Sequence, residues 1–396
     1  MKLTVNRLKL LGLLGDINKV VPSRPTLPIW SCTLFQAKEG YLMVAGTDLD
    51  TALVRRVKAK IIRPGEALCQ TKKLVAFLKA LAIESVVISL VAKQVKVEAG
   101  KVSTDLQAWN VRDYPPLPRR IMSRAATVAG LSPALGHVAY AATKEDYRPV
   151  LAGVYMDGNR LVAADGFRLA QATLKASGKL PEAIIQNRAC QIIRDIFPGK
   201  VKVNARIVKT GGNANTLVQF EDAERLLITR AVQGNYPDWE KLIPTNGRVV
   251  SFDNADMKSA LRLIQVCNPD NHPIRLFSRG AKLTLYTVDD DCWTRAEIPV
   301  KGKVKVAVNP KYLADIMNQL PDGRVVLRWK EGNKPLVFKS KGEAHVVMPM
   351  FVAEWAEKTP ETSSTPSQSN DTAAAVAEAE RITAETHQGA ETTVAV

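Results

Sequence analysis

The sequence predicts an α+β architecture in which one kind of domain, with two helices covering a face of antiparallel strands, occurs three times. Three kinds of landmark keep one period: the acidic residue of a tight turn, a cation of the second helix, and a tyrosine that precedes proline. They are Asp48, Asp165 and Asp289 (117 and 124 residues apart), Lys73, Arg188 and Lys311 (115 and 123), and Tyr114 and Tyr236 (122). Because the landmarks also keep one order, an internal repeat explains them better than chance agreement.

The first repeat begins with a strand at Lys2–Val5 and a helix whose leucines between Leu8 and Leu14 have helical spacing. Prolines end this helix and frame a loop around Arg24. A second, amphipathic helix is expected at Thr71–Leu81, with Thr71 as a candidate N-cap and lysines on the exposed face. The remaining segments are strands at 34–36, 41–45, 53–59, 85–90 and 94–98, a proline-rich break at 114–118 and a linker at 119–124.

The same order runs twice more. In the second repeat, an apolar run within Leu161–Ala170 meets an Asp165-Gly166 turn and then an alternating pattern, which indicates a β-hairpin within residues 151–170. Helices are expected through Leu135 and Val138 and at 188–197, 257–266 and 309–320; strands are expected at 200–208, 217–220, 249–252, 274–277, 282–288, 325–329, 336–340 and 345–350. The segment Gly234–Pro244 separates the second repeat from the third.

Charge is distributed unevenly along the 396 residues, whose net charge is +16. From Glu354 onward, eight acidic residues stand against Lys358 and Arg381. Residues 1–353 therefore carry 53 basic and 31 acidic residues, a net charge of +22. A body this basic indicates an anionic partner, most commonly nucleic acid, although a basic soluble surface without such a partner is the alternative.

The composition changes abruptly at position 354. The remaining segment is rich in Glu, Thr, Ser and Ala and has few large apolar residues, so we expect a mostly disordered acidic tail. The repeats and the tail together predict four parts: three domains at 1–120, 121–246 and 247–353, and the tail at 354–396.

Sequence signals for catalysis, metal binding and membrane insertion are lacking. The four histidines have no metal-ligand spacing, the five cysteines are scattered singly, and no serine or cysteine lies in a nucleophile-elbow pattern. We therefore expect no catalytic residue, no metal and no cofactor. No apolar run is long enough to span a bilayer and the amino terminus does not have the pattern of a secretory signal, so a cytoplasmic location without membrane contact is expected.

Two segments can be interpreted either as ligand sites or as ordinary turns. The glycine-rich Lys209–Asn215 suggests a phosphate loop, but it has no Gly-Lys-Ser/Thr ending and lies between expected strands, which favours a hairpin turn. Asp289, Asp290 and Asp291 suggest a divalent metal, but adjacent residues at a strand end do not converge on one ion without other ligands. A solvated turn is therefore the favoured interpretation.

Several segments, in the expected order, carry a resemblance to a known family. They are Met1-Lys-Leu-Thr-Val5, Ser23-Arg-Pro-Thr-Leu-Pro-Ile29, Ala45-Gly-Thr-Asp-Leu49, Ala164-Asp-Gly-Phe-Arg-Leu169, Asn235-Tyr-Pro-Asp-Trp-Glu-Lys-Leu-Ile-Pro244 and Val346-Val-Met-Pro-Met350. Each motif is weak alone, and jointly they are specific. Over residues 1 to about 352 the chain resembles the bacterial sliding clamps, the β subunits of DNA polymerase III.

The resemblance implies three DNA-clamp domains per chain and a head-to-tail homodimer, a six-domain ring around duplex DNA. It implies a non-catalytic processivity factor that tethers the replicative polymerase to DNA in the cytoplasmic nucleoid. Other implied partners are the clamp loader, which would use the ATP, and clamp-binding proteins such as repair polymerases, mismatch repair proteins and ligase. The alternatives are an open DNA-binding scaffold and a specialised phage or plasmid clamp, whereas a metabolic enzyme is disfavoured by the missing catalytic site.

Cations on the repeated helices fit this interpretation because they would present charge to phosphates without contacting base edges. Contacts of that kind hold DNA in any register, as sliding requires. The candidate DNA-binding residues are Arg24, Lys72, Lys73, Lys79, Arg188, Arg194, Lys258, Arg262, Lys311 and Tyr312. Each cation is equally compatible with a solvated helix face.

The resemblance also implies a pocket for partner peptides between the second and third domains. Its candidate residues, here called the partner site, are Leu151, Ala164, Gly166, Phe167, Arg168, Leu169, Pro237, Lys241, Leu242, Val346, Val347, Met348, Pro349 and Met350. Methionine and leucine would form an adaptable apolar floor, and Arg168 and Lys241 would orient a polar peptide end. Leu151, Leu169, Leu242 and Val347 are alternatively plain core residues.

The chain departs from the family pattern in the partner site. Ala164 and Phe167 replace a usual threonine and histidine, which makes the rim more apolar, and Lys241 replaces a frequent arginine and loses its planar fork. Phe351 occupies a position that is often basic, and the family usually ends near Val352. By resemblance, Val266 and Gln265 are candidate ring-interface residues. We also expect the acidic tail to compete weakly with partners or to be repelled by DNA.

Overall fold

The computed structural model describes residues 1–145, 147–210, 213–268, 272–288, 293–330, 334–340, 342–352 and 355. The chain divides into two units, residues 1–351 and 352–396, and every helix and strand given below belongs to the first. The expected acidic tail, apart from Trp355, lies outside the described residues, as do Gly211, Gly212, the three aspartates 289–291 and Cys292.

The first repeat alternates strands with two helices. Its elements are β1 (Lys2–Asn6), α1 (Arg7–Val20), β2 (Cys32–Lys38), β3 (Tyr41–Thr47), β4 (Thr51–Lys58), β5 (Lys60–Arg63), β6 (Gly65–Gln70), α2 (Thr71–Ala80), β7 (Ser85–Val91), β8 (Gln94–Ala99) and β9 (Val102–Gln107). The side chain of Asn6 caps α1 by accepting a hydrogen bond from the Lys9 amide. Leu10, Leu14 and Ile17 then form the buried stripe of the helix.

The second and third repeats follow the same order. The second has β10 (Ala126–Ala129), α3 (Leu131–Ala139), β11 (Gly153–Asp157), β12 (Arg160–Ala164), β13 (Arg168–Thr173), β14 (Lys175–Ala176), β15 (Ala183–Gln186), α4 (Asn187–Ile196), β16 (Val201–Thr210), β17 (Asn213–Glu221) and β18 (Arg225–Val232). The third has β19 (Arg248–Asp253), α5 (Asn254–Val266), β20 (Ile274–Arg279), β21 (Lys282–Val288), β22 (Trp293–Pro299), β23 (Lys305–Val308), α6 (Pro310–Gln319), β24 (Arg324–Trp329), β25 (Leu336–Ser340) and β26 (Glu343–Val347). The predicted α+β repeat is confirmed.

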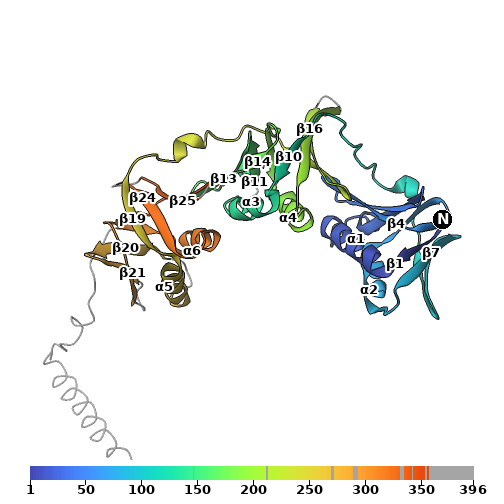
Figure 1. The fold of residues 1–396 in the computed structure, drawn as a ribbon, viewed down its shortest axis with the longest axis horizontal. Coiled ribbons are helices and arrows are strands. Elements are labelled where there is room, and N and C mark those ends of the chain that lie inside the picture. The colour runs from blue at the N-terminus through green and yellow to red at the C-terminus, as the bar shows by residue number, and fades with distance from the viewer. Residues whose placement is uncertain are drawn as a thin grey trace, which may run out of the picture. The chain divides into compact units, whose positions relative to one another are not determined.

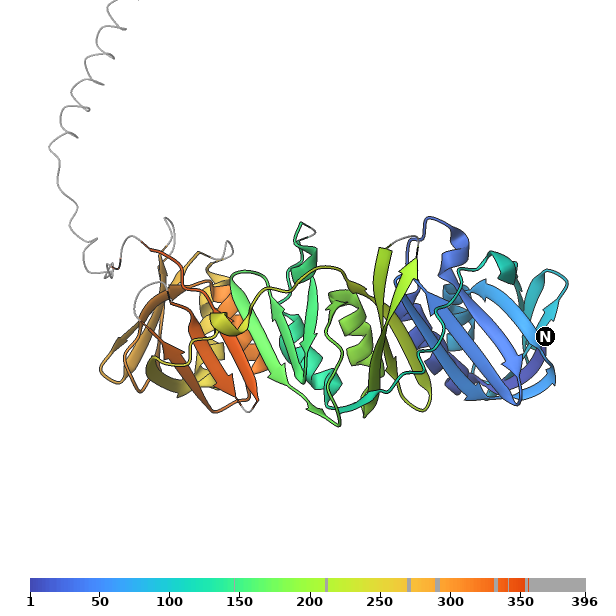
Figure 2. The same cartoon turned by 90° about the horizontal axis from the view of Figure 1, so that it is seen from above.

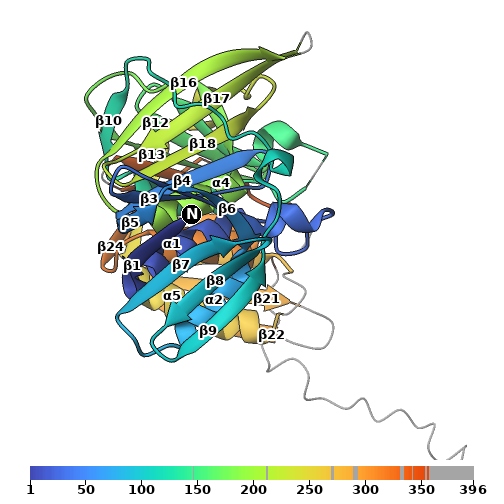
Figure 3. The ribbon, with the colours of Figure 1, turned by 90° about the vertical axis from the view of Figure 1, so that its right-hand side faces the viewer.

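Antiparallel pairing joins each repeat to the next. Strand β4 of the first repeat pairs with β18 of the second, with Thr51 opposite Thr229. Strand β13 of the second repeat pairs with β26 of the third, with Arg168 opposite Val347. Two outer sheets remain, ordered β5-β1-β7-β8-β9 and β22-β21-β20-β23. Figure 3 shows β7, β8 and β9 side by side in the first of these.

In every repeat the two helices pack on each other and on one face of the strands. Helix α1 contacts α2, β3 and β4, helix α3 contacts α4, β12 and β13, and α5 contacts α6 and β22. Figures 1 and 2 show the helices on one side of the strands within each repeat. Strand residues of one parity, such as Leu42, Val44 and Leu53, are therefore fully buried, and their neighbours of the other parity face away from the helices.

Some local expectations were wrong. Thr71 is the first residue of α2 rather than its cap, since the cap is Gln70. The Thr71 hydroxyl is buried and instead donates to the Ser31 carbonyl at 2.8 Å. Residues 151–170 form three strand segments rather than one hairpin, because a first turn follows Asp157, and the predicted Asp165-Gly166 turn then joins β12 to β13. Eight strands were not predicted, because they are short or carry polar and charged residues that weaken the alternating pattern: β5, β6, β9, β14, β15, β18, β22 and β23.

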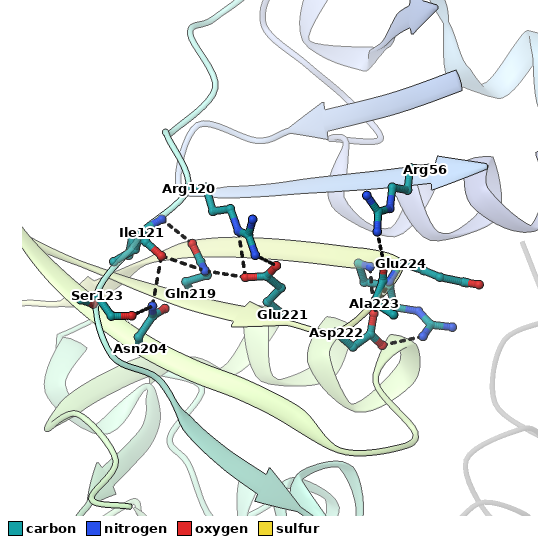
Figure 4. A network of polar contacts seen from close by, with 11 residues as sticks. Arg56, Arg120, Ile121, Ser123, Asn204, Gln219, Glu221, Asp222, Ala223 and Glu224 are labelled. Carbon is teal, nitrogen blue, oxygen red and sulfur yellow. Dashed lines mark hydrogen bonds and ion pairs between the residues drawn. The ribbon is translucent and has the colours of Figure 1, made fainter. Parts of the chain in front are cut away.

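The predicted linker at 119–124 has no regular structure, yet buried amides hold it in place (Figure 4). The Gln219 side chain accepts from the Ile121 amide at 2.6 Å and donates to its carbonyl at 3.3 Å. Asn204 donates to the carbonyls of Ile121 and Ser123, both at 3.2 Å. The two amide side chains thus take the place of a neighbouring strand.

The strands around the glycine-rich segment are consistent with the predicted hairpin. Thr210 of β16 pairs with Asn213 of β17 in antiparallel register, so the segment does not open a helix. No helix of the described residues is long and apolar enough to cross a membrane. Within the same part of the chain, no group of His, Cys, Asp or Glu side chains is arranged to hold a metal ion.

Candidate partner and DNA-binding surfaces

The turn between β12 and β13 is built by the carboxylate of Asp165. Its Oδ1 accepts hydrogen bonds from the amides of Phe167 and Arg168, each at 2.9 Å, and the Asp165 amide donates to the Arg168 carbonyl at 3.2 Å. Gly166 has a φ of +94°, a conformation that a side chain would strain. The turn therefore presents Phe167 outward, with its side chain 60% exposed.

The same turn occurs at the preceding junction. Asp48 Oδ1 accepts from the amides of Asp50 and Thr51, and the Asp48 amide donates to the Thr51 carbonyl. Leu49 takes the place of Gly166 and also has a positive φ, of +81°. The repeat thus extends to individual hydrogen bonds, which the weak sequence identity did not show.

The Arg168 guanidinium lies at this turn, where two carboxylates and two aromatic rings contact its positive charge. Its Nε donates to Asp165 Oδ2 at 2.9 Å and its Nη1 donates to Asp315 Oδ2 of α6 at 2.5 Å. The guanidinium carbon lies 4.5 Å from the ring centre of Tyr312 and 5.3 Å from that of Tyr140. Burial disfavours the charge, but the bonds and charges of Asp315 and Asp165 outweigh it, so the pKa of Arg168 is raised. With 9% of its side chain exposed, Arg168 organises the turn.

Pairing of β13 with β26 brings distant parts of the partner site together. Leu169 lies opposite Val346, and the Met348 amide donates to the Phe167 carbonyl at 2.8 Å. Ala164, Leu169 and Val346 pack with Trp239 in one buried cluster. The residues with exposed apolar side chains are Phe167, Leu242, Met348, Met350 and Phe351.

The other candidates differ in role. Val347 is fully buried in the core of the third repeat, and Leu151 is buried outside the Trp239 cluster. Lys241 is exposed and forms an ion pair with Asp238 at 2.5 Å, next to exposed Pro237. Pro349 is half-buried and Gly166 is exposed. The structure therefore divides the partner site into buried supports and an exposed apolar rim.

Two side chains at this turn were not among the predicted partner-site residues. Asp315 holds Arg168, and its only sequence signal is its place one turn after Tyr312 on α6. Arg148 is exposed, and its Nη1 lies within 2.9 Å of where a side chain on Gly166 would begin. Local sequence does not identify either residue as part of this turn. Asp315 is distant from the turn in the chain, and Arg148 lies in a loop.

The first turns of the second helices carry exposed cations. Lys72, Arg188 and Lys311 are each the second residue of their helix, and none of the three helices has an acidic residue in its first turn. A cation opposes the helix dipole there by about 0.3–1 kcal/mol, and the same helix end attracts phosphate. By helix position, Lys72 rather than Lys73 is the equivalent of Arg188 and Lys311.

The remaining DNA-binding candidates divide by their contacts. Lys73, Lys79, Lys311 and Arg24 are exposed, with no carboxylate partner among the described residues. The cations with ion pairs or backbone bonds are Lys72 (Ser23 carbonyl, 3.1 Å), Arg188 (Asp48, 3.4 Å; Val20 carbonyl, 2.9 Å), Arg194 (Asp195, 3.6 Å), Lys258 (Asp322, 2.8 Å) and Arg262 (Lys258 carbonyl, 3.3 Å).

The Tyr312 side chain packs at the turn between β12 and β13. Its ring centre is 6.3 Å from that of Phe167, and it covers the Arg168 guanidinium. Burial, followed by the carboxylate of Asp165, raises the pKa of its hydroxyl. Because the exposed Lys311 directly precedes it on α6, a contact of Tyr312 with DNA stays a prediction.

Comparisons with known proteins identify similar chains. A family model described as the N-terminal domain of DNA polymerase III beta subunit matches residues 1–118, and one for the central domain matches residues 127–238. Proteins named beta sliding clamp from Streptomyces coelicolor and Pseudomonas aeruginosa are each 26% identical, over 86% and 88% of this chain and 94% and 100% of theirs. Solved DNA polymerase sliding clamps of Bartonella birtlesii and Caulobacter crescentus superpose with a TM-score of 0.81 each, at 24% identity, over 89% of this chain and all of theirs.

Proposed function

The chain belongs to the DNA polymerase III beta subunit family, and we propose that two copies of it close head to tail into a ring around duplex DNA. It is a sliding clamp, a non-catalytic protein that works with DNA and a DNA polymerase. The proposed domains are residues 1–120, 121–246 and 247–353, each holding two helices and their strands. The repeated strand pairing between successive domains carries the proposal.

That pairing follows one rule. The third long strand of one repeat, β4 or β13, pairs with the last strand of the next, β18 or β26. By the same rule β22 requires the last strand of a following repeat, and β9 requires the third strand of a preceding one. Both are edge strands of their sheets in the described chain. A second copy satisfies both edges, and the two copies then close a ring of six domains.

The helices support the same closure. Helix α1 of the first repeat contacts α4 of the second across their junction. The equivalent helices at a ring junction are α5 of one chain and α2 of the other. Leu263 and Val266, near the end of α5, are 65% and 81% exposed, which leaves apolar surface for a second copy to cover.

The exposed helix cations make sequence-independent phosphate contacts in this arrangement. Lys73, Lys79 and Lys311 are exposed and have no carboxylate partner among the described residues, so they are available to DNA. Phosphate contacts fix no register on the base sequence, and the closed ring retains the DNA that weak contacts alone would release.

We propose that the partner site binds a short apolar peptide segment of the polymerase, the clamp loader and other clamp-binding proteins in the cytoplasm, including repair polymerases, mismatch repair proteins and ligase. Phe167, Leu242, Met348 and Met350 offer apolar surface that is exposed before binding. Arg148, which has no carboxylate partner among the described residues, is the cation that meets a polar peptide end. Arg168 serves this site indirectly, by fixing the turn.

Loading onto closed and linear DNA tests the ring. A clamp loader and ATP load the chain onto nicked circular duplex, and competitor DNA is then added so that release can be followed. A ring stays on the circle and runs off once a restriction enzyme linearises it. Equally fast release from both forms would establish an open DNA-binding scaffold instead.

A further inference from the structure

Two hollows meet at the junction of the first and second repeats, away from the helices. One, of about 530 Å³, and another, of about 610 Å³, share Met43 of β3 and Arg56 of β4 in their walls. The first is lined further by Tyr41, and the second by Lys200 and Lys202 beside the turn between β17 and β18.

Strand register sets these side chains in a row. Tyr41 lies opposite Lys58 and Met43 lies opposite Arg56. Their sequence neighbours on the strands point into the core beneath α1, so the row itself faces away from that helix. Tyr41 is 41% exposed and Met43 is 38% exposed. We call the row and its two neighbouring lysines the Tyr41 surface, defined as Tyr41, Met43, Arg56, Lys58, Lys200 and Lys202.

Most carboxylates that line the two hollows are paired with other cations, as Figure 4 shows for Glu221 and Arg120. The ion pairs with arginines are Glu221 with Arg120, Asp222 with Arg225 and Glu224 with Arg55. Glu39 pairs with Lys38 at 2.9 Å, whereas Glu66 accepts a hydrogen bond from Gln36 and has no cationic partner in the described part of the chain.

Arg56 instead donates to the Ala223 carbonyl at 2.9 Å and lies 5.7 Å from the Tyr41 ring centre. Lys58, Lys200 and Lys202 have no carboxylate partner in the described part of the chain. Four cations without a carboxylate partner therefore stand against one unpaired carboxylate, Glu66, on the surface that carries the exposed Tyr41 ring, which leaves a net positive charge.

We propose that the Tyr41 surface binds single-stranded nucleic acid. Cations that follow a backbone, combined with an exposed aromatic ring on which a base stacks, are the features by which proteins hold single strands without sequence preference. A duplex hides its base faces from Tyr41, and an acidic peptide has no base to stack. The surface is separate from the helices that carry the proposed duplex contacts, so the two proposals stand independently.

Binding of a fluorescein-labelled twelve-residue oligothymidine to the full chain, followed by anisotropy over a salt series, tests the proposal. Arg56→Ala with Lys58→Ala lowers the slope of log affinity against log salt concentration by roughly 0.7 per cation removed. Tyr41→Ala weakens binding about fivefold or more and leaves the slope unchanged, and Tyr41→Phe retains binding. The matched double variant Lys179→Ala with Lys339→Ala, which removes the same charge at exposed positions outside both proposed nucleic-acid surfaces, stays within about twofold of the wild type. The helix variant Lys73→Ala with Lys311→Ala is measured beside it.

Two results would overturn the proposal. If the helix variant loses the oligothymidine and the surface variants do not, the strand occupies the proposed duplex channel. If Tyr41→Ala binds like the wild type and a twelve-residue polyglutamate competes equally well, the surface attracts any polyanion. Circular dichroism melting shows that each variant is folded. Retention on circular duplex is measured in parallel, and its loss would count against the ring and not against this surface.

Discussion

At the scale of single residues, the surroundings of Arg168 show what could and could not be predicted from sequence. The Asp-Gly turn was predictable, since it depends on neighbours in the chain. The burial of Arg168 was not, because Asp315 and Tyr140 come from other elements. A residue predicted to orient a peptide is therefore mainly a support for the turn.

Replacing Arg168 by alanine is expected to destabilise the protein. The change leaves Asp165, whose side chain is 11% exposed, and Asp315 without their shared cation, and breaking such a pair costs about 3 kcal/mol. Thermal unfolding measures the loss. Lys241→Ala is the matched control, because its ion pair with Asp238 is exposed to solvent and contributes little to stability. Equal melting temperatures for the two variants would contradict the assigned role.

Phe167→Ala with Met348→Ala tests the partner site without disturbing the support. Both side chains are exposed, at 60% and 39%, so the fold should be retained. Loss of apolar contact is expected to weaken binding of polymerase and clamp-loader peptides about tenfold or more. Isothermal titration calorimetry measures the affinity, and Met122→Ala, at an exposed position elsewhere, is the control. Unchanged peptide affinity would remove these residues from the site.

Glu343 predicts a dependence of stability on acid pH. Burial alone would raise its pKa, but two imidazoles outweigh burial and lower the pKa from the ordinary value of 4.5. His345 Nε2 lies 3.7 Å from Oε2, and His137 Nδ1 is hydrogen-bonded to Oε1 at 2.5 Å. A lowered folded-state pKa adds stability that is present above the unfolded value and is lost as pH falls through the folded one. Chemical denaturation between pH 3 and 6 should therefore show a loss below pH 4.5 that is smaller in Glu343→Gln. The same slope in both chains would contradict this assignment.

At the scale of elements, the pattern of apolar residues located all six helices, but helix starts were displaced by a residue or more. The displacement matters for the cations, because position within the first turn identifies Lys72 as the equivalent of Arg188 and Lys311. Among the unpredicted strands, β9 and β22 lie at sheet edges and β18 lies at a junction between repeats. Their residues are selected for contacts that no local window of sequence contains.

The helix cations are expected to favour DNA binding at the expense of helix stability. Lys73→Ala with Lys311→Ala should leave the free energy of unfolding unchanged or raise it by up to about 1 kcal/mol. The same variant should lower the salt slope of duplex binding by roughly 0.9 per cation. Arg188→Ala is the informative comparison, because it also breaks the ion pair with Asp48 and should reduce stability. A stability loss in the double variant would mean that these lysines serve the fold.

At the scale of the whole molecule, the threefold repeat was predictable from landmark spacing, but the order in which repeats pair was not. Pairing of Arg168 with Val347 joins residues 179 positions apart, and nothing in either strand specifies the other. The structure supplies the rule that joins successive repeats, and the rule leaves β9 and β22 as edges. The proposed dimer rests on these two edges.

Charge at the end of α5 should therefore open the ring without unfolding the chain. Leu263→Asp with Val266→Asp places two carboxylates on side chains that are 65% and 81% exposed in the single chain, so the melting temperature should change little. In the dimer those carboxylates would be buried without partners, at a cost that should shift the chain to monomers. Sedimentation velocity at micromolar concentration measures the shift, and retention on circular duplex should be lost with it.

Met122→Asp, which adds a carboxylate at an 82% exposed position away from the predicted interface, should remain dimeric. A dimeric Leu263→Asp with Val266→Asp variant that still stays on circles would place the junction elsewhere and refute the pairing of β22 with β9.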